Sequence, residues 1–220
     1  IATLVPEGVE GSVSTLPGSF KEFITDESQE RVIRENIWKC AEHIATLSDR
    51  TGKALHLGLE PEPLGYFETS AETVQFFERL RTEHPNDPKL TEHLGVNYDT
   101  CHLAVEYEEP EVALGALREA GIRISKLHLS AALIVRPDEP TRARLKPFEE
   151  DVYLHQVVER LPDGSLNRHR DLNVALATHN PAEEWRIHFH IPLHSPDGDW
   201  FDSTRGHIDG VLRELKKDPA

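Results

Sequence analysis

The 220 residues include 39 acidic and 24 basic side chains, which gives a formal net charge of −15 at pH 7. This acidic balance argues against broad attraction to nucleic acid or to anionic membranes. The chain is long enough to bury a substantial core, and it contains no apolar run near the roughly 18 residues that cross a bilayer. Two cysteines, Cys40 and Cys101, do not make a disulfide framework. We therefore expect a cytoplasmic protein without membrane insertion.

Both ends of the sequence resemble interrupted elements. The first residues, IATLVPEG, are typical of a helix end that runs into a turn, and the last, HIDGVLRELKKDPA, are typical of a helix. The chain also contains no methionine. We expect a fragment of a longer protein.

Strand and helix signals alternate from the start. GSVSTLPG (11–18) predicts a short strand that ends in a Pro-Gly turn. Asp26 and Gln29 have the spacing of a capping box, and they open a helix that Gly52 closes. ALHLGLEPEP (54–63) then predicts an apolar strand that ends in two carboxylates.

The alternation continues through the middle of the chain. Thr69 and Glu72 open a second helix with capping-box spacing. HLGVNYDTCHLAV (93–105) predicts the next strand, and Pro110 suits the first position of the helix that follows. IRISKLHLSAAL (122–133) predicts another strand with polar residues near its end.

The pattern changes after this strand. The charged segment 136–151 indicates an extended loop, and 152–169 predicts a β-hairpin around a Pro-Asp-Gly turn. A short helix over 171–177 and a strong strand, EWRIHFHIPLH (184–194), come before a final helix. We interpret residues 134–170 as a loop and hairpin insertion.

The repeated strand–helix order predicts right-handed βαβ units and a parallel sheet. Nearly continuous apolar strands agree with a sheet that is buried on both faces. The sheet would be either a (β/α) barrel or an open doubly wound sheet. Five candidate strands are too few for a complete eight-stranded barrel.

Carboxylates and imidazoles occur at the ends of four predicted strands. The carboxyl ends of parallel strands share one face of a sheet, so these side chains would converge there. Mixed nitrogen and oxygen ligands of this kind suit Zn²⁺, Mn²⁺ or Mg²⁺. The residues are Glu60, Glu62, Asp99, His102, His128, His188 and His190.

Each of these residues also has an ordinary structural interpretation. Glu62 alone could be a loop residue, and an isolated His128 could be a hydrogen-bonded core histidine. His188 and His190 would share one strand face roughly 7 Å apart, which also occurs without metal. Their recurrence at successive strand ends favours a metal or polar active site. Cys101, expected to point away from its neighbours along a strand, is interpreted as a buried structural cysteine.

Four motifs together resemble the xylose isomerase-like barrel superfamily: LEPEP, YDTCH, KLHLS and HFH. That superfamily includes sugar isomerases and epimerases and the endonuclease IV family of DNA-repair enzymes, and the D-T-C-H run is especially similar to endonuclease IV. The resemblance implies a set of divalent-metal ligands, namely Glu60, Asp99, His102 and His128. The identity and number of the metal ions stay open.

Six longer motifs resemble the EboE family of metabolite traffic proteins: PEGVEGSVSTLPGSFK, LGLEPEPLGYFET, DTCHLAVEYE, ISKLHLSAAL, EDVYLHQVVER and EEWRIHFHIPLH. Proteins of that family are encoded in bacterial operons linked to secondary metabolites. The resemblance covers nearly the whole chain. It implies a single (β/α)8 TIM-barrel domain of the xylose isomerase-like type over residues 1–220, truncated at both ends and comprising about strands 3 to 7.

These observations predict an EboE-like protein that handles or traffics a small metabolite and has a divalent-metal site like that of sugar isomerases. The alternative is an active metal-dependent sugar or polyol isomerase or epimerase, in which His188 and His190 act as acid/base groups or further ligands. Endonuclease IV-like phosphodiester hydrolysis is a third class, which the acidic balance disfavours. The expected partners are a small-molecule metabolite and proteins of the same operon.

Overall fold

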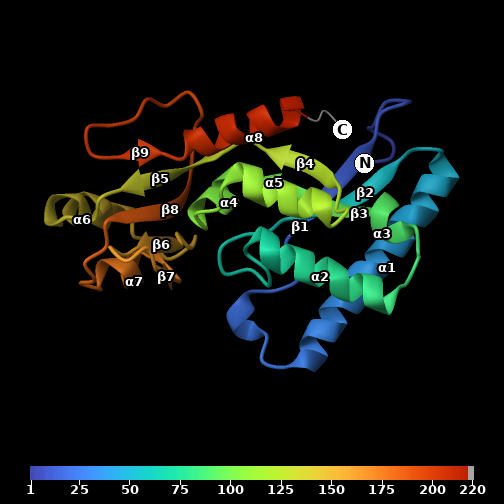
Figure 1. Ribbon diagram of the computed structural model, residues 1–220, viewed down its shortest axis with the longest axis horizontal. Helices are drawn as coiled ribbons and strands as arrows, with labels where there is room; N and C mark the ends of the chain where they lie inside the picture. Colours follow the sequence, from blue (N-terminus) through green and yellow to red (C-terminus); the bar gives the residue numbers. More distant parts are fainter. Residues whose placement is uncertain (218–220) are drawn as a thin grey trace. The chain divides into compact units, whose positions relative to one another are not determined.

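The computed structural model describes residues 1–217, and the chain forms two compact units (Figure 1). The first unit comprises residues 1–99 and 112–128, and the second comprises residues 100–111 and the chain from residue 129 onward. Each unit has its own β-sheet. No helix within residues 1–217 is long and apolar enough to cross a membrane. The predicted single domain over residues 1–220 stays a prediction.

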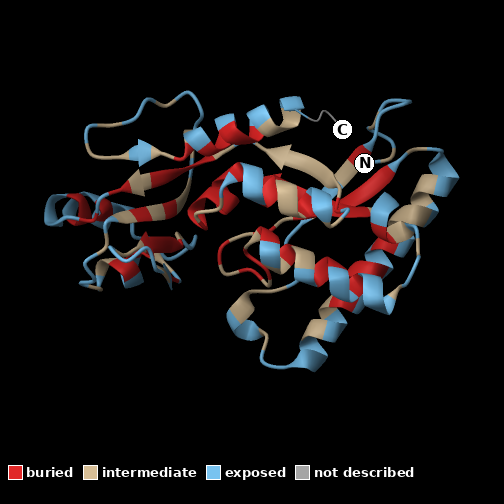
Figure 2. Cartoon of the chain, viewed as in Figure 1, coloured by how far each residue is buried: buried red, intermediate tan, exposed pale blue. Residues whose placement is uncertain are grey.

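The sheet of the first unit has four parallel strands in sequential order. Their carboxyl ends therefore meet at one edge of the sheet. The strands are β1 (Gly11–Thr15), β2 (Leu55–Leu59), β3 (Leu94–Asp99) and β4 (Ile124–His128). Figure 2 shows β2 and β3 as buried along their whole length, which explains their nearly continuous apolar sequence.

Helices connect these parallel strands, as the alternating pattern predicts. They are α1 (Glu27–Thr51), α2 (Ser70–Glu83), α3 (Lys89–Glu92) and most of α5 (Pro110–Glu119), with the short 3₁₀ helix η1 (Lys21–Phe23) before α1. The predicted start of α1 is confirmed, because the Asp26 carboxylate accepts from the backbone N–H groups of Ser28 and Gln29. The helix ends at Gly52, whose φ of +66° favours glycine.

The predicted start of α2 is also confirmed, and its cap is expected to contribute measurably to the free energy of unfolding. The Thr69 side chain accepts a hydrogen bond of 3.2 Å from the backbone N–H of Glu72. Thr69→Ala is expected to lower the free energy of unfolding by about 1 kcal/mol, because an N–H group at the helix start loses its partner. Urea denaturation checks this, with Thr82→Ala on the exposed surface of α2 as the control. An equal loss in both variants would contradict the role of the cap.

The two faces of the first sheet differ in character. Val13, Leu55 and Leu57 face α1, where Ile44 and Leu47 lie beside them. Side chains alternate along a strand, so the other face of β2 carries His56 and Gly58, and Glu60 follows on that side. The side chains of this sheet that can bind a ligand or a metal ion therefore lie on its polar face.

The second unit contains a five-stranded sheet in the order β7-β6-β8-β5-β9, in which every pair is antiparallel. The strands are β5 (Ala131–Val135), β6 (Val157–Arg160), β7 (Leu166–His169), β8 (Glu184–Ile191) and β9 (Asp202–Ser203). The helices are α4 (Thr100–Val105), α6 (Glu139–Leu145), η2 (Lys146–Phe148), α7 (Leu172–Leu176) and α8 (Arg205–Lys217). Trp185, Ile187 and Leu133 lie in its core. The predicted hairpin over 152–169 is confirmed as β6 and β7.

The predicted (β/α)8 barrel, present as about strands 3 to 7, is wrong. The described residues form a parallel sheet of four strands and a separate antiparallel sheet of five strands. The physical reason is that the chain leaves the parallel sheet after β4, and β5 then forms antiparallel pairs with β8 and β9. The parallel sheet therefore gains no further strand within the described residues.

Three element boundaries also differ from the sequence predictions. The strand predicted over 93–105 ends at Asp99, and Cys101 and His102 lie on α4. The strand predicted over 122–133 is two strands, β4 and β5, which belong to different sheets. The segment predicted as an extended loop contains α6.

Candidate functional site

Three side chains meet where strands β2, β3 and β4 of the first unit end. Glu60 directly follows β2, while Asp99 and His128 are the last residues of β3 and β4 and are register partners. The His128 Nδ1 atom lies 3.1 Å from Glu60 Oε1 and 3.3 Å from Asp99 Oδ2. One ligand atom from each residue lies within 4.8 Å of those of the others. We name Glu60, Asp99 and His128 the carboxylate–histidine group.

The spacing of this group fits a metal ion. Two ligand atoms that each lie about 2.1 Å from one ion, at octahedral or tetrahedral angles, are about 3.0–3.4 Å apart. Both distances from His128 Nδ1 to the carboxylate oxygens, 3.1 and 3.3 Å, fall in that range. Two carboxylate oxygens and one imidazole nitrogen form a donor set that suits Mn²⁺, Mg²⁺ or Zn²⁺.

Asn97 completes the surroundings of the group. Its Nδ2 donates to Glu60 Oε2 at 2.5 Å and lies 3.2 Å from His128 Nδ1. Its Oδ1 is buried and accepts no hydrogen bond from the described residues. A buried amide oxygen is costly to leave without a partner. Asn97 therefore offers a further oxygen to a ligand or an ion.

Glu62 adds a third carboxyl beside Glu60 and Asp99. Burial is the main cause that raises the pKa of Glu62 to about 7, and the like charges of Glu60 and Asp99 contribute to the same rise. Three carboxyls in this small region concentrate negative charge, which a bound cation would offset. The first unit thus has both the geometry and the charge of a cation site.

A second group, which we name the histidine group, lies in the second unit. His188 and His190 project from the same face of β8, and their Nε2 atoms are 3.0 Å apart. The His102 ring on α4 meets both rings edge-on, at centroid distances of 4.6 and 5.4 Å. The prediction that His188 and His190 share one face is confirmed. The structure brings His102 together with these two histidines.

Gln156 fixes the state of His188. Its Oε1 accepts from His188 Nδ1 at 2.7 Å, so Nδ1 holds the proton and Nε2 presents its lone pair toward His190. Burial lowers the pKa of His188 well below its ordinary value, and the nearby His102, His190 and His155 lower it further. A neutral imidazole, oriented through its other nitrogen, is the form that binds a metal.

Cys101 is buried, as the sequence predicts, and packs with Val105, Ala132 and Val158. Its position on α4 brings its Sγ to 3.6 Å from the Phe189 carbonyl oxygen. Ligand atoms of Cys101, His188 and His190 also lie within 4.8 Å of one another. Sulfur and imidazole ligands together suit Zn²⁺.

Comparisons with family models, with curated proteins and with solved structures found no match. The resemblance to the EboE family and to the xylose isomerase-like superfamily therefore stays a prediction from the sequence motifs.

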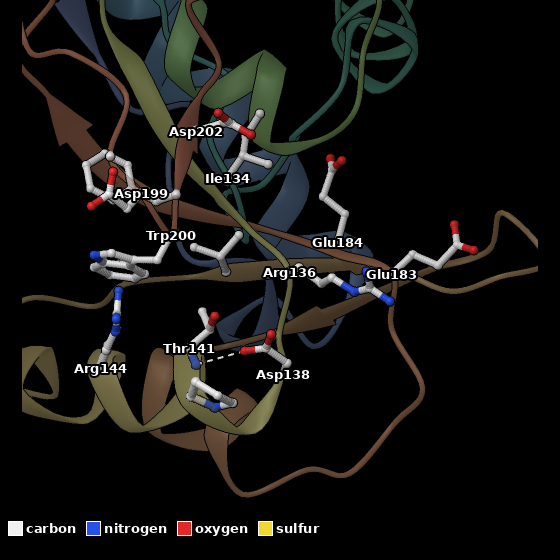
Figure 3. Close-up of a pocket in the computed structure, with 14 residues that line it drawn as sticks. Ile134, Arg136, Asp138, Thr141, Arg144, Glu183, Glu184, Asp199, Trp200 and Asp202 are labelled. Atoms are coloured by element: carbon white, nitrogen blue, oxygen red, sulfur yellow. Dashed lines mark hydrogen bonds between the residues drawn. The ribbon is translucent and has the colours of Figure 1, made fainter.

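The second unit also contains a cavity of about 560 Å³, between α6, β5 and the segment before β9 (Figure 3). Trp200 lines it and has the Arg144 guanidinium 5.7 Å from its ring centre, while the Asp138 carboxylate is occupied by the backbone N–H of Thr141. None of the predicted site residues lines this cavity.

Two residues of these groups were missed from sequence, Asn97 and Gln156. Asn97 lies two positions before Asp99, so the alternation of β3 places both side chains on one face. The alternation of side chains along β3 could therefore have indicated Asn97 as a further site residue. Gln156 stands just before β6 and pairs with His188 through sheet register, which no local pattern in the sequence encodes.

Proposed function

We propose that this protein binds a divalent metal ion through Glu60, Asp99 and His128 and uses it to hold a small hydroxylated metabolite. The observation that carries the proposal is the spacing of their ligand atoms, within 4.8 Å of one another at the ends of three adjacent parallel strands. The sequence resemblance to metabolite traffic proteins agrees with this function.

The residues at and around the carboxylate–histidine group would have different roles. Glu60, Asp99 and His128 would hold the ion, which supplies Lewis-acid polarisation of a hydroxyl or carbonyl oxygen. Asn97 orients Glu60 and His128 through its amide nitrogen and keeps its buried Oδ1 for a donor on the metabolite. Handling of a metabolite needs no further step.

A second candidate function is turnover, as in a metal-dependent isomerase or epimerase. The position of Glu62 favours it, because this carboxyl stands close to Glu60 and Asp99 but is not part of the carboxylate–histidine group. A carboxyl in that position can move a proton on a bound hydroxy-carbonyl compound. Isomerisation of small hydroxy-aldehydes by the metal-loaded protein, lost in Glu62→Gln with binding retained, would distinguish turnover from handling.

Titration with Mn²⁺ tests the metal site. The chain is expected to bind one Mn²⁺ ion at the oxygen-rich carboxylate–histidine group. His128→Ala should weaken this binding by more than about 100-fold, because groups that merely orient a ligand already contribute about 10–100-fold. His179→Ala is the matched control, since His179 is exposed and belongs to neither group. Absence of Mn²⁺ binding in the unaltered chain, or equal binding by His128→Ala, would refute the proposal.

A further inference from the structure

Lys126 lies on the polar face of the first sheet, close to the carboxylate–histidine group. It is the register partner of Asn97, and two residues later His128 is the register partner of Asp99. Lys126 and His128 are therefore neighbours on one face of β4, about 7 Å apart along the strand. The Lys126 ammonium donates to Ser14 Oγ of β1 at 2.9 Å, so the side chain spans the curved face of the sheet.

Strands β2 and β3 lie between Ser14 and Lys126, and each has a glycine, without a side chain, on the polar face of the sheet. Gly58 on β2 is the register partner of Ser14, and a Cβ atom there would lie only 3.2 Å from the Asn97 backbone nitrogen. A Cβ at Gly95 of β3 would lie 2.4 Å from Ser125 Oγ. No side chain can therefore be added on β2 or β3 at these positions without displacing a neighbour.

The charge of Lys126 has no carboxylate partner within residues 1–217. Among the described residues its ammonium donates a side-chain hydrogen bond only to the neutral hydroxyl of Ser14, although the chain has 39 acidic residues and the lysine is half-buried. Lys21, by contrast, pairs with Glu68 and Glu72. A half-buried ammonium without an anion is costly, and it attracts one from solution.

We propose that Lys126 binds the anionic end of the metabolite whose oxygens meet the metal at Glu60, Asp99 and His128. The ligand class is therefore a small hydroxylated acid, either a sugar carboxylate or a phosphorylated polyol, and not a neutral sugar. This inference rests on the proposed function and names its substrate class. The short spacing between Lys126 and His128 requires a compact molecule that carries its anionic group close to its hydroxyl groups.

Calorimetric titration of the Mn²⁺-loaded full chain tests this assignment with three matched probes: gluconate, sorbitol 6-phosphate and sorbitol. At least one anionic probe is expected to bind ten or more times more tightly than sorbitol, and the two anionic probes separate carboxylate from phosphate recognition. Lys126→Met should bring that ratio close to one, and Lys126→Arg should retain most of it. Lys216→Met, an exposed lysine on α8, is the control.

The outcomes separate the two proposals. Equal binding of all three probes by the unaltered chain, or an unchanged ratio in Lys126→Met, overturns the assignment and leaves Lys126 as a counter-charge for the carboxylates. Failure to bind Mn²⁺ overturns the proposed function instead. In that case the same titrations without metal test the assignment of Lys126. A preference for the anionic probes that disappears in Lys126→Met supports the assignment, and a preference that stays overturns it. Circular dichroism of each variant checks that the chain is folded.

Discussion

Glu159→Ala is expected to lower the free energy of unfolding by about 3–5 kcal/mol, because it removes the buried partner of several donors. The Glu159 side chain has no exposed surface. Asn167 and Asn180 donate to its Oε1, and Trp185 Nε1 donates to its Oε2 at 3.1 Å. His169 Nε2 lies 3.2 Å from Oε1. Truncation would leave these groups buried around an empty space.

Glu159→Gln is the matched control for this prediction. It preserves the shape of the side chain, but its amide N–H₂ would face groups that are themselves donors, so a loss of about 1–3 kcal/mol is expected. Urea denaturation followed by tryptophan fluorescence measures both losses, and the Trp185 indole contacts Glu159 directly. A loss below about 1 kcal/mol in Glu159→Ala would mean that water replaces the carboxylate without cost.

The same carboxyl makes stability depend on pH. Burial alone would raise the pKa of Glu159, but hydrogen bonds from Asn167 and Asn180 and the charge of His169 bring it below its ordinary value. A folded-state pKa below the unfolded value contributes stability above about pH 4.3, and this contribution is lost as the pH falls through the folded pKa. Glu159→Gln should therefore flatten the acid limb of the stability curve.

Gln156→Leu is expected to weaken Zn²⁺ binding by the histidine group by about 10–100-fold. The substitution removes the acceptor for His188 Nδ1, so the orientation of the imidazole ring is no longer fixed. His188→Ala should weaken binding further, since it removes a ligand. Competition with a chromogenic chelator measures the affinity. The predicted ligands His102 and His190 remain in place in both variants.

Gln75→Leu on the exposed face of α2 controls for the loss of an amide. Mn²⁺ binding at the carboxylate–histidine group should not change in Gln156→Leu, because Gln156 orients His188, which is not a member of that group. If Gln156→Leu binds Zn²⁺ as tightly as the unaltered chain, the histidine group is a packing feature and not a metal site.

Local signals in the sequence predict the helices and the hairpin well. The Asp26 and Thr69 caps fix the starts of α1 and α2 because a side-chain oxygen satisfies N–H groups that the helix leaves without partners. The same signal was overlooked at Asp138, whose carboxylate caps α6, because the surrounding charge and prolines indicated a loop. One of them, Pro140, lies in the first turn of α6, where proline is well tolerated.

The direction and the sheet of each strand could not be predicted in this way. The apolar pattern of 122–133 continues across Leu129 and Ser130, but the chain leaves the parallel sheet there and enters the antiparallel one. Thr100 Oγ1 holds this junction by donating to the Ser130 carbonyl and accepting from its N–H. A contact between residues so far apart in the chain has no signature in local periodicity.

The candidate site was predictable to the extent that it depends on strand ends. Glu60, Asp99 and His128 come together because parallel neighbours end at one edge, which the strand–helix order implies. The helix that carries His102 could not be predicted from the same logic, since the chain turns into α4 immediately after Asp99. The pairing of His188 with Gln156 depends on antiparallel register.

The path of the polypeptide gives the carboxylate–histidine group a consequence for folding. The chain leaves the first unit directly after Asp99 and again directly after His128. An ion held by Glu60 and these two residues would therefore act as a reversible cross-link that closes two long loops of the chain. Loop closure reduces the entropy of the unfolded chain. Binding of the ion would therefore also increase the free energy of unfolding.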